Sequence, residues 1–242
     1  MKRERLTHAQ RKEQTRERLL VAARKIFVKK GLTATSVENI AEAAGYTRGA
    51  FYSNFNGKPE LMLELLRRDH DIAQANLRAI MDEGGTCDQM IARAIDYYSR
   101  HFRDYDCYPL WVEAKLLACR DRVFQERFDA FHHERLDQVS ACIRSFSERD
   151  GRPLSLRAET LAIGILSLCD GVQFFRMRDP KMASEKAMQF VFAEILSSLL
   201  SRQAEGVPHT DTRSGAPDRG RGRGAGIGDT DQIRARGSAR IS

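Results

Sequence analysis

The sequence predicts an all-α fold of about nine helices. Apolar residues recur at intervals of three and four wherever a periodicity can be read, which is the spacing of one face of an α-helix. No run of β-branched residues alternating with polar ones reaches the length of a strand. Glycines and prolines interrupt the pattern at intervals of roughly one helix. At 242 residues, the chain is long enough for one large domain or two modest ones.

The first helix is predicted over residues 10–30. Its apolar side chains, among them Leu19, Ala23 and Phe27, fall on one stripe, and basic residues occupy most of the remaining surface. Gly31 marks its end, because glycine adopts the positive φ that commonly terminates a helix. This pattern indicates a helix that is packed on one side and hydrated on the other.

A short second helix is predicted over residues 36–43. It opens with a capping-box pattern formed by Thr35 and Glu38. Gly45 ends it and introduces a tight turn.

The third helix, predicted over residues 47–54, follows this turn directly. Thr47 can cap its first turn, and Phe51 and Phe55, four residues apart, would anchor it to a core. Two short helices joined by a glycine turn form the helix-turn-helix arrangement, which sets its second helix into the major groove of DNA.

Six further helices are predicted, over residues 58–82, 87–104, 107–119, 121–149, 154–178 and 180–202. Residues 203–242 hold 8 of the 17 glycines and no aromatic residue or leucine, so they cannot bury enough apolar surface to fold. We therefore divide the chain into a helix-turn-helix domain at 1–57, a helical ligand-binding and dimerisation domain at 58–202 and a disordered Gly/Arg-rich tail at 203–242.

The positive charge of the chain is concentrated at its N-terminus. Residues 1–58 carry 13 basic and 5 acidic side chains, a net charge of +8, whereas residues 59–202 carry 20 and 23, a net charge of −3. A basic helix-turn-helix unit indicates a polyanionic partner, and double-stranded DNA is the partner we expect.

The side chains of the third helix that do not face the core form a candidate DNA-reading surface. Arg48 can donate two hydrogen bonds to guanine or bind phosphate, and Gly49 allows close approach to a thymine methyl group. Hydroxyl groups and helix N-termini suit phosphate oxygens. The candidate DNA-binding residues are Thr35, Ser36, Thr47, Arg48, Gly49, Tyr52, Ser53, Asn54 and Lys58. A surface helix with incidental polarity is the alternative.

The stretch TSVENIAEAAGYTRGAFYSNFNGKPEL, residues 35–61, resembles the DNA-binding domain of the TetR family of bacterial transcriptional regulators. The resemblance lies in the glycine turn, the T-R-G-A-F-Y helix and the F-x-x-K-x-E-L start of the next helix. It implies that the residues named above contact DNA, that the protein is a homodimer on a near-palindromic operator, and that a small-molecule effector releases it from that operator. Repression is the usual action of the family, so the resemblance implies a repressor. Ser53 and Asn54 depart from the family pattern, in which many members carry His or an aromatic residue.

A nonspecific nucleic-acid-binding protein is the alternative function. The basic N-terminus and the Arg-Gly run at residues 219–224 would then bind any duplex through its phosphates, with equal affinity for every sequence and a steep dependence on salt.

Aromatic residues are dense between Tyr97 and Phe131 and suggest an apolar ligand cavity in the second domain. Glu113, close to Trp111 and Tyr108, would favour a planar cation. Core packing is the alternative for each aromatic residue, and a structural role is the alternative for Asp170, a carboxylate within an apolar run. The candidate pocket residues are Phe102, Tyr108, Trp111, Glu113, Phe128, His132, Asp170 and Phe174.

Two apolar seams in the last two predicted helices indicate how the chain dimerises. More of their faces are apolar than one chain needs, so two helices from each subunit would form a four-helix interface. The candidate interface residues are Leu161, Ile165, Leu168, Val172, Phe175, Met188, Val191, Ile195 and Leu199.

Other classes of protein are not indicated. The sequence has no nucleophile elbow, phosphate loop or Glu-x-x-His pair, so we expect neither an enzyme nor a cofactor. Its five cysteines form no C-x-x-C pair and no metal-ligand cluster, so reduced thiols and no metal are expected. The longest apolar stretch, Leu161 to Cys169, is too short for a membrane span, and no secretory signal is seen, so we expect a cytoplasmic protein.

Overall fold

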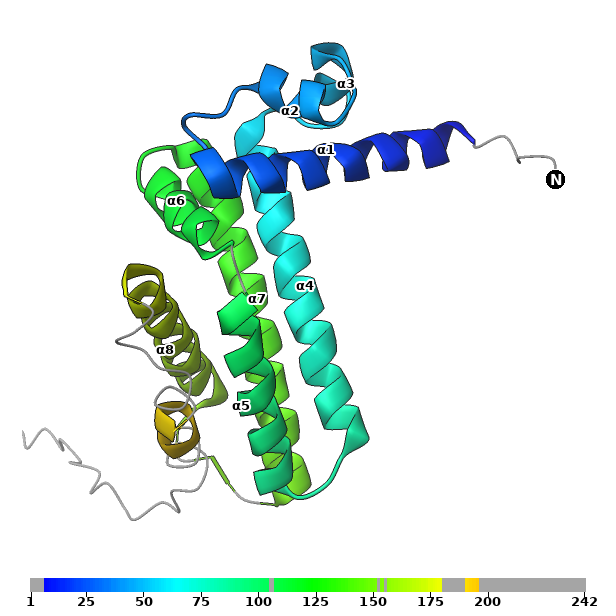
Figure 1. Cartoon of the computed structure of the whole chain (residues 1–242). Helices are drawn as coiled ribbons and strands as arrows, with labels where there is room; N and C mark the ends of the chain where they lie inside the picture. Colours follow the sequence, from blue (N-terminus) through cyan, green and yellow to red (C-terminus); the bar gives the residue numbers. More distant parts are fainter. Residues whose placement is uncertain (1–6, 105–106, 152, 155, 180–189, 196–242) are drawn as a thin grey trace, which may run out of the picture. The chain divides into compact units, whose positions relative to one another are not determined.

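The computed structural model describes residues 7–104, 107–151, 153–154, 156–179 and 190–195. All of them belong to one compact unit, which ends at Glu205. The helices, labelled as in Figure 1, are α1 (His8–Lys30), α2 (Val37–Ala43), α3 (Arg48–Tyr52), α4 (Lys58–Glu83), α5 (Cys87–Asp104), α6 (Tyr108–Ala118), α7 (Arg122–Asp150) and α8 (Ala158–Arg178). Residues 190–195 are also helical, and no strand occurs among the described residues. The predicted all-α fold is confirmed.

The bounds of α1 to α7 agree with the predicted ranges to within two residues, whereas α8 begins four residues later than predicted. Prolines lie in the first turns of α4 and α6, where the missing N–H costs no hydrogen bond. Glycines with positive φ end α1, α4 and α7. Local signals in the sequence therefore fix most helix ends.

The N-terminus of α2 differs by one residue from the predicted capping box. Ser36 is the cap: its Oγ accepts a hydrogen bond from the Asn39 N–H (3.0 Å), and the Asn39 Oδ1 accepts one from the Ser36 N–H (3.2 Å). Thr35 is buried instead, and its hydroxyl donates to the Gly31 carbonyl (2.6 Å). The prediction that Thr35 caps this helix together with Glu38 was wrong, because burial of Thr35 shifts the box by one residue.

A glycine turn separates α2 from α3, as predicted. Gly45 adopts a φ of +76°, and the next N–H, of Tyr46, donates to the Ala41 carbonyl at 2.8 Å. The turn places Thr47 as the cap of α3, where its hydroxyl accepts the N–H of Ala50 (3.3 Å).

A single hydrophobic cluster joins the helix-turn-helix to α4, α6 and α7. Its fully buried members include Leu19, Phe27, Ile40, Phe51, Phe55, Leu61, Leu66, Leu110 and Phe131. The core is therefore continuous across residues 57–58, where the sequence suggests a domain boundary.

The remaining helices extend away from this cluster. α4 packs against α5 and α7, and α8 packs against α6 and α7 (Figure 1). Two smaller apolar clusters, one around Met81, Met90 and Phe146 and the other around Val139 and Leu161, supply residues to these contacts.

Within the described part of the chain, α8 alone is long and apolar enough to cross a membrane. Two features mark it as a helix packed in a protein. Leu161 and Ala162 are buried in an internal cluster, and Asp170 forms an ion pair with Lys115 of α6 at 2.6 Å.

Some predictions concern residues that the structure does not describe. The helix predicted over 180–202 is described only at residues 190–195, so Met188 and Leu199 lie outside the described residues. The tail at 203–242 lies outside them as well.

Candidate nucleic-acid interface and ligand cavity

Two phenylalanines anchor α3, as their spacing predicts. Phe51 and Phe55 are 0% and 1% exposed, and their ring centroids are 5.8 Å apart. The guanidinium of Arg16 in α1 lies 4.3 Å from the Phe55 centroid and donates to the Asn54 carbonyl at 2.9 Å. One side of α3 is thus held against the core, and the other is left to solvent.

Five predicted DNA-contact residues are exposed on or beside α3: Thr47, Arg48, Gly49, Tyr52 and Ser53. The Arg48 guanidinium pairs with Glu38 of α2 at 3.1 Å and lies 5.5 Å from the Tyr52 ring centroid. Because an exposed ion pair contributes only about 0–1 kcal/mol, a phosphate or a base can replace Glu38 as the partner of Arg48. This surface presents a guanidinium, hydroxyl groups and an accessible backbone.

The other four predicted contact residues bind within the protein. The ammonium of Lys58 donates to the carbonyls of Leu32 (2.8 Å) and Thr35, and Thr35 itself is buried. The Ser36 hydroxyl caps α2, and the Asn54 side-chain amide donates to a backbone carbonyl of α3 at 2.8 Å. In this structure these groups help to hold the α1–α2 turn, the start of α2 and the end of α3 in place.

A cavity of about 190 Å³ lies among α4, α5, α6, α7 and α8. It is somewhat larger than the cavity of about 150 Å³ that holds benzene in an engineered protein. α4 and α7 run in the same direction along it, because His70 contacts Gln138 (2.8 Å) and, further along both helices, the Met81 carbonyl accepts a hydrogen bond from Arg149.

The lining changes from polar to apolar along these helices. On α4, the polar residues Asp69, His70 and Gln74 precede Leu77, Ile80 and Met81; on α7, Arg135 precedes Val139, Ile143 and Phe146. The polar residues lie nearer the starts of α4 and α7, where Arg67 and Glu134 are also paired. The starts of both helices pack in the cluster that contains α6 and the helix-turn-helix, so the polar end of the cavity lies toward these elements. The far end is lined by apolar residues of α4, α5 and α7.

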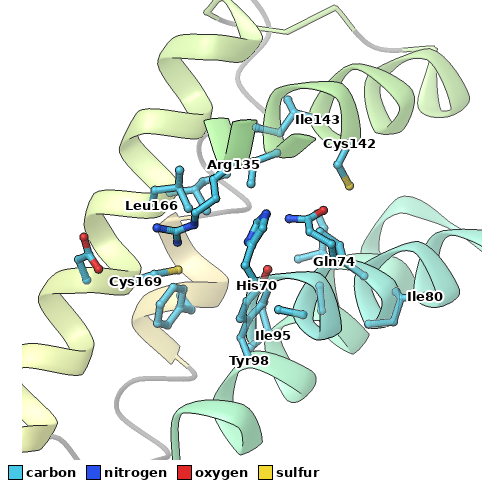
Figure 2. A pocket seen from close by; sticks show the side chains of 18 of the residues that line it. His70, Gln74, Ile80, Ile95, Tyr98, Arg135, Cys142, Ile143, Leu166 and Cys169 are labelled. Carbon is cyan, nitrogen blue, oxygen red and sulfur yellow. The ribbon is translucent and has the colours of Figure 1, made fainter. Parts of the chain in front are cut away.

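The polar end holds a guanidinium and a neutral imidazole. Figure 2 shows His70 next to Gln74 in the cavity, with the Arg135 guanidinium on the other side of His70, toward Cys169. Arg135 lies 4.3 Å from the ring centroid of Trp111. Burial, reinforced by the charge of Arg135, lowers the pKa of His70 below its usual value, so this imidazole is uncharged at neutral pH.

Other titratable groups of the lining are also held in their neutral forms. Burial raises the pKa of Tyr108 to about 12, and its hydroxyl donates to the Asp170 carbonyl at 2.8 Å. Burial also raises the pKa of the Cys169 thiol to about 12. Both groups therefore keep their protons at neutral pH.

The structure brings three of the predicted pocket residues, Tyr108, Trp111 and Asp170, to the cavity wall. His132 lines a second hollow, of about 260 Å³, which shares Asp170 with the first. Phe128 is buried in the main cluster, 4.6 Å from the His132 ring. Phe174 is exposed on α8, and the side chain of Phe102 lies outside the described residues.

Glu113 lies away from the cavity, contrary to the expectation. Its Oε2 accepts the N–H of Leu32 at 2.6 Å, beside Gly31 at the end of α1. The planar-cation site predicted around it is not formed, because its carboxylate points to the helix-turn-helix. α6 consequently carries Tyr108 and Trp111 on the cavity wall and Glu113 on the α1–α2 turn.

The outward face of α8 differs from the predicted dimer seam. Leu161 and Val172 are 1% and 6% exposed, and Ile165 and Leu168 are half-buried against internal clusters. Leu161 and Val172 therefore have little surface left for a partner, because they already pack within the chain. Of the other predicted residues, Phe175 is exposed, and Val191 and Ile195 are half-buried.

A different set of apolar residues faces outward from α8. Ile163, Phe174 and Phe175 are 54%, 47% and 58% exposed. Gly164 and Gly171 lie on the same side with open space around them, which would permit a second helix to approach closely. We call these five residues the α8 outer face.

The sequence analysis missed the polar lining residues His70, Gln74 and Arg135. A signal for them exists. His70 and Gln74 follow Leu66 at intervals of four residues, and Arg135 lies four residues from both Phe131 and Val139. Each is a polar residue within an otherwise buried apolar stripe, and such a position indicates a functional cavity or a buried hydrogen bond.

Comparisons with known proteins agree with this architecture. The family model described as "Bacterial regulatory proteins, tetR family" matches residues 19–65. The HTH-type transcriptional regulator TtgR of Pseudomonas putida is 41% identical over 71 residues, which cover 29% of this chain and 34% of TtgR. The match thus spans only about a third of the length of that relative.

Two further proteins are similar over most of their length. The HTH-type transcriptional activator FasR of Mycolicibacterium smegmatis is 24% identical over 196 residues, covering 79% of this chain and 87% of FasR. The transcriptional regulator FadR of Bacillus subtilis, solved in complex with stearoyl-CoA, aligns with a TM-score of 0.62 at 16% identity, over 76% of this chain and 98% of FadR. That alignment shows a shared fold. Residues 19–65 therefore match the DNA-binding part of the TetR family of bacterial regulatory proteins, and the all-helical chain shares the fold of solved regulators such as FadR.

Proposed function

We propose that this chain is a homodimeric, DNA-binding transcriptional repressor that leaves a near-palindromic operator when a small molecule fills the cavity. One observation carries the proposal: Thr47, Arg48, Gly49, Tyr52 and Ser53 are exposed together on or beside α3. A recognition helix needs this arrangement, with its inner side held by the core and its outer side polar and accessible.

The roles of these residues follow from their chemistry. Arg48 reads a base edge or binds a phosphate, depending on how deeply α3 enters the groove. The Thr47 and Ser53 hydroxyls and the Tyr52 phenol reach phosphate oxygens. The excess of basic residues in this part of the chain adds an attraction that is independent of sequence.

Dimerisation uses the α8 outer face. Burial of the exposed side chains Ile163, Phe174 and Phe175 against a second copy would stabilise the dimer. The open space at Gly164 and Gly171 allows the two α8 helices to approach closely. A twofold axis through this contact presents two copies of α3 to two half-sites about 34–36 Å apart, which is one turn of DNA.

Effector control is a difference in affinity between two arrangements of the same dimer. In one arrangement the two α3 helices match the spacing of the half-sites, and in the other they are displaced from it. A ligand that binds more tightly to the displaced arrangement lowers operator affinity by the difference between its binding free energies for the two arrangements. α6 is suited to transmit this difference, because it contributes to the cavity wall and contacts the α1–α2 turn through Glu113.

Selection of binding sequences from a random duplex library tests the DNA-binding proposal. We expect a palindrome with half-sites one helical turn apart. Arg48→Ala is expected to weaken binding by about 1–3 kcal/mol and to change the preferred base at one position of each half-site. Arg122→Ala, at an α7 side chain that is 90% exposed, serves as the control. Equal affinity for all duplexes, falling steeply with salt, would favour the nonspecific alternative.

A reporter gene placed behind the selected operator tests the direction of regulation. We expect lower expression with the chain present and recovery when effector is added. Higher expression would make the protein an activator, which is how FasR is described.

A further inference from the structure

We propose that the effector is a monocarboxylic acid with an apolar body about the size of a phenylpropyl or heptyl group, its carboxylate bound at Arg135 and its body directed toward Met81 and Phe146. This inference rests on the proposed function, in which the cavity is the effector site. It adds the chemical class of the effector, which follows from the charges, the polarity gradient and the size of the cavity.

The charges of the lining favour an anion. Both carboxylates in the described lining already have a cation: Asp69 pairs with Arg24 at 2.9 Å, and Asp170 pairs with Lys115 at 2.6 Å. Arg135 adds a positive charge to the same wall. A cationic ligand would therefore meet carboxylates that already have cations and would lie near the Arg135 guanidinium, whereas a carboxylate would be attracted to that guanidinium.

Arg135 is suited to hold a carboxylate. A guanidinium has five N–H donors in a planar fork, so it can bind both oxygens of a carboxylate and keep contacts with the protein. Its plane is supported by Trp111, whose ring centroid is 4.3 Å away. The lining also holds three buried neutral polar side chains, His70, Gln74 and Gln173, which can supply polar contacts without a competing negative charge.

The rest of the cavity defines the body of the ligand. Beyond Gln74 the α4 lining is Leu77, Ile80 and Met81, which faces apolar residues of α5 and α7. The volume of about 190 Å³ exceeds the benzene-sized cavity of about 150 Å³ by room for only a few more carbon atoms. His70 and Met81 are eleven residues apart on α4, which is about 16 Å along a helix, so the cavity as a whole is elongated.

The single tryptophan of the chain provides a direct assay, since Trp111 lines the cavity next to Arg135. Octanoate, octanamide and octylamine are titrated into the full chain, with 3-phenylpropanoate and its amide as a second matched pair. Tryptophan fluorescence and calorimetry follow binding. We expect an acid to bind at least about tenfold more tightly than its amide, because the charge-assisted pair is lost, and the amine to bind more weakly than either.

Substitution of Arg135 tests the position of the carboxylate. Arg135→Gln is expected to bring acid and amide to within about threefold of each other, whereas Arg135→Lys keeps most of the preference. Arg127→Gln, at an exposed residue two turns earlier on α7, is the control and should bind as the wild type does. Thermal unfolding of every variant establishes that it is folded.

Three results would overturn the proposal: equal or tighter binding of the amide or amine to the wild type, an acid preference that survives in folded Arg135→Gln, or no saturable binding of either acid by both methods. The proposed function is tested separately, by operator selection without any effector. An operator without acid binding refutes the ligand class alone; acid binding without an operator refutes the DNA-binding proposal and leaves the ligand class standing.

Discussion

Removal of the Glu113 carboxylate tests the contact between α6 and the helix-turn-helix. Its Oε2 accepts the Leu32 N–H at 2.6 Å, and Leu32 is only 9% exposed, so water does not easily replace the carboxylate. A hydrogen bond to a charged group contributes about 1.5–3 kcal/mol. We therefore expect Glu113→Ala to lower the free energy of unfolding by about 2 kcal/mol and Glu113→Gln, which keeps an acceptor, by about 1 kcal/mol.

Thermal unfolding measures this difference. For a chain of this size about 1 kcal/mol corresponds to about 2–4 °C, so the melting temperature should fall by about 4–8 °C in Glu113→Ala and by half as much in Glu113→Gln. Glu126→Ala is the matched control, because Glu126 is 72% exposed and makes only a surface ion pair, with Arg122 at 3.6 Å. We expect it to change stability by less than about 0.5 kcal/mol.

Operator affinity with and without effector measures the functional part of the same contact. If α6 transmits the state of the cavity through Glu113, the effector should weaken DNA binding less in Glu113→Ala than in the wild type. A stability within about 0.5 kcal/mol of the wild type would refute the energetic reasoning. A clear loss of stability with an unchanged effector response would show that the contact supports the fold and does not carry the coupling.

Three further changes test the fold, the interface and the pH dependence. Gly31→Ala should lower stability by about 1–3 kcal/mol in urea unfolding, because φ and ψ of 77° and 169° are accessible essentially to glycine alone; an unchanged midpoint would contradict this. Phe175→Glu should raise the dimer dissociation constant at least about tenfold in ultracentrifugation, whereas Val123→Glu, at an exposed α7 residue, should not. A dimer that stays intact in Phe175→Glu would show that the α8 outer face is not the dimer interface. Burial and nearby cations lower the pKa of His132 to about 4, so below pH 6.5 the unfolded chain binds a proton that the folded chain does not. Stability should therefore fall from pH 7.5 to 5.5 by about 1 kcal/mol more in the wild type than in His132→Phe; equal slopes would refute it.

The helix-turn-helix could be predicted in detail because its determinants are local. Gly45 ends one helix, Thr47 caps the next, and Phe51 and Phe55 face inward by their spacing alone. The exception is Thr35. Two adjacent hydroxyl residues both fit a capping pattern, and only packing against the end of α1 decides which of them is buried.

The cavity could not be predicted to the same degree, because its lining residues come from five helices and are spread from Asp69 to Phe192. Trp111 and Tyr108 were found from the density of aromatic residues, but the same criterion also selected Phe128, which is core. Arg135 and His70 were missed because a charged or polar residue in a helix is usually exposed. Their buried surroundings follow only from the way α4 packs against α7.

The α8 outer face shows a related limit. Periodicity correctly indicates that α8 has more than one apolar side, but it does not say which side faces the chain's own core. Leu161 and Val172 belong to the more continuous apolar stripe of α8, and both are buried against other helices of the same chain. The side left for a partner is interrupted by Gly164 and Gly171, which lower its apparent hydrophobicity and are the residues that let another helix come close.

Both α4 and α6 line the cavity and pack against α1, so a signal between the two sites can pass through either helix. They meet at the same turn: Lys58, the first residue of α4, donates to the Leu32 carbonyl, while Glu113 of α6 accepts the Leu32 N–H. A ligand that shifts α6 relative to α4 therefore pulls the two polar groups of Leu32 in different directions. Because Leu32 lies between α1 and α2, we expect a displacement of α6 at the cavity to reach the helix-turn-helix through this residue.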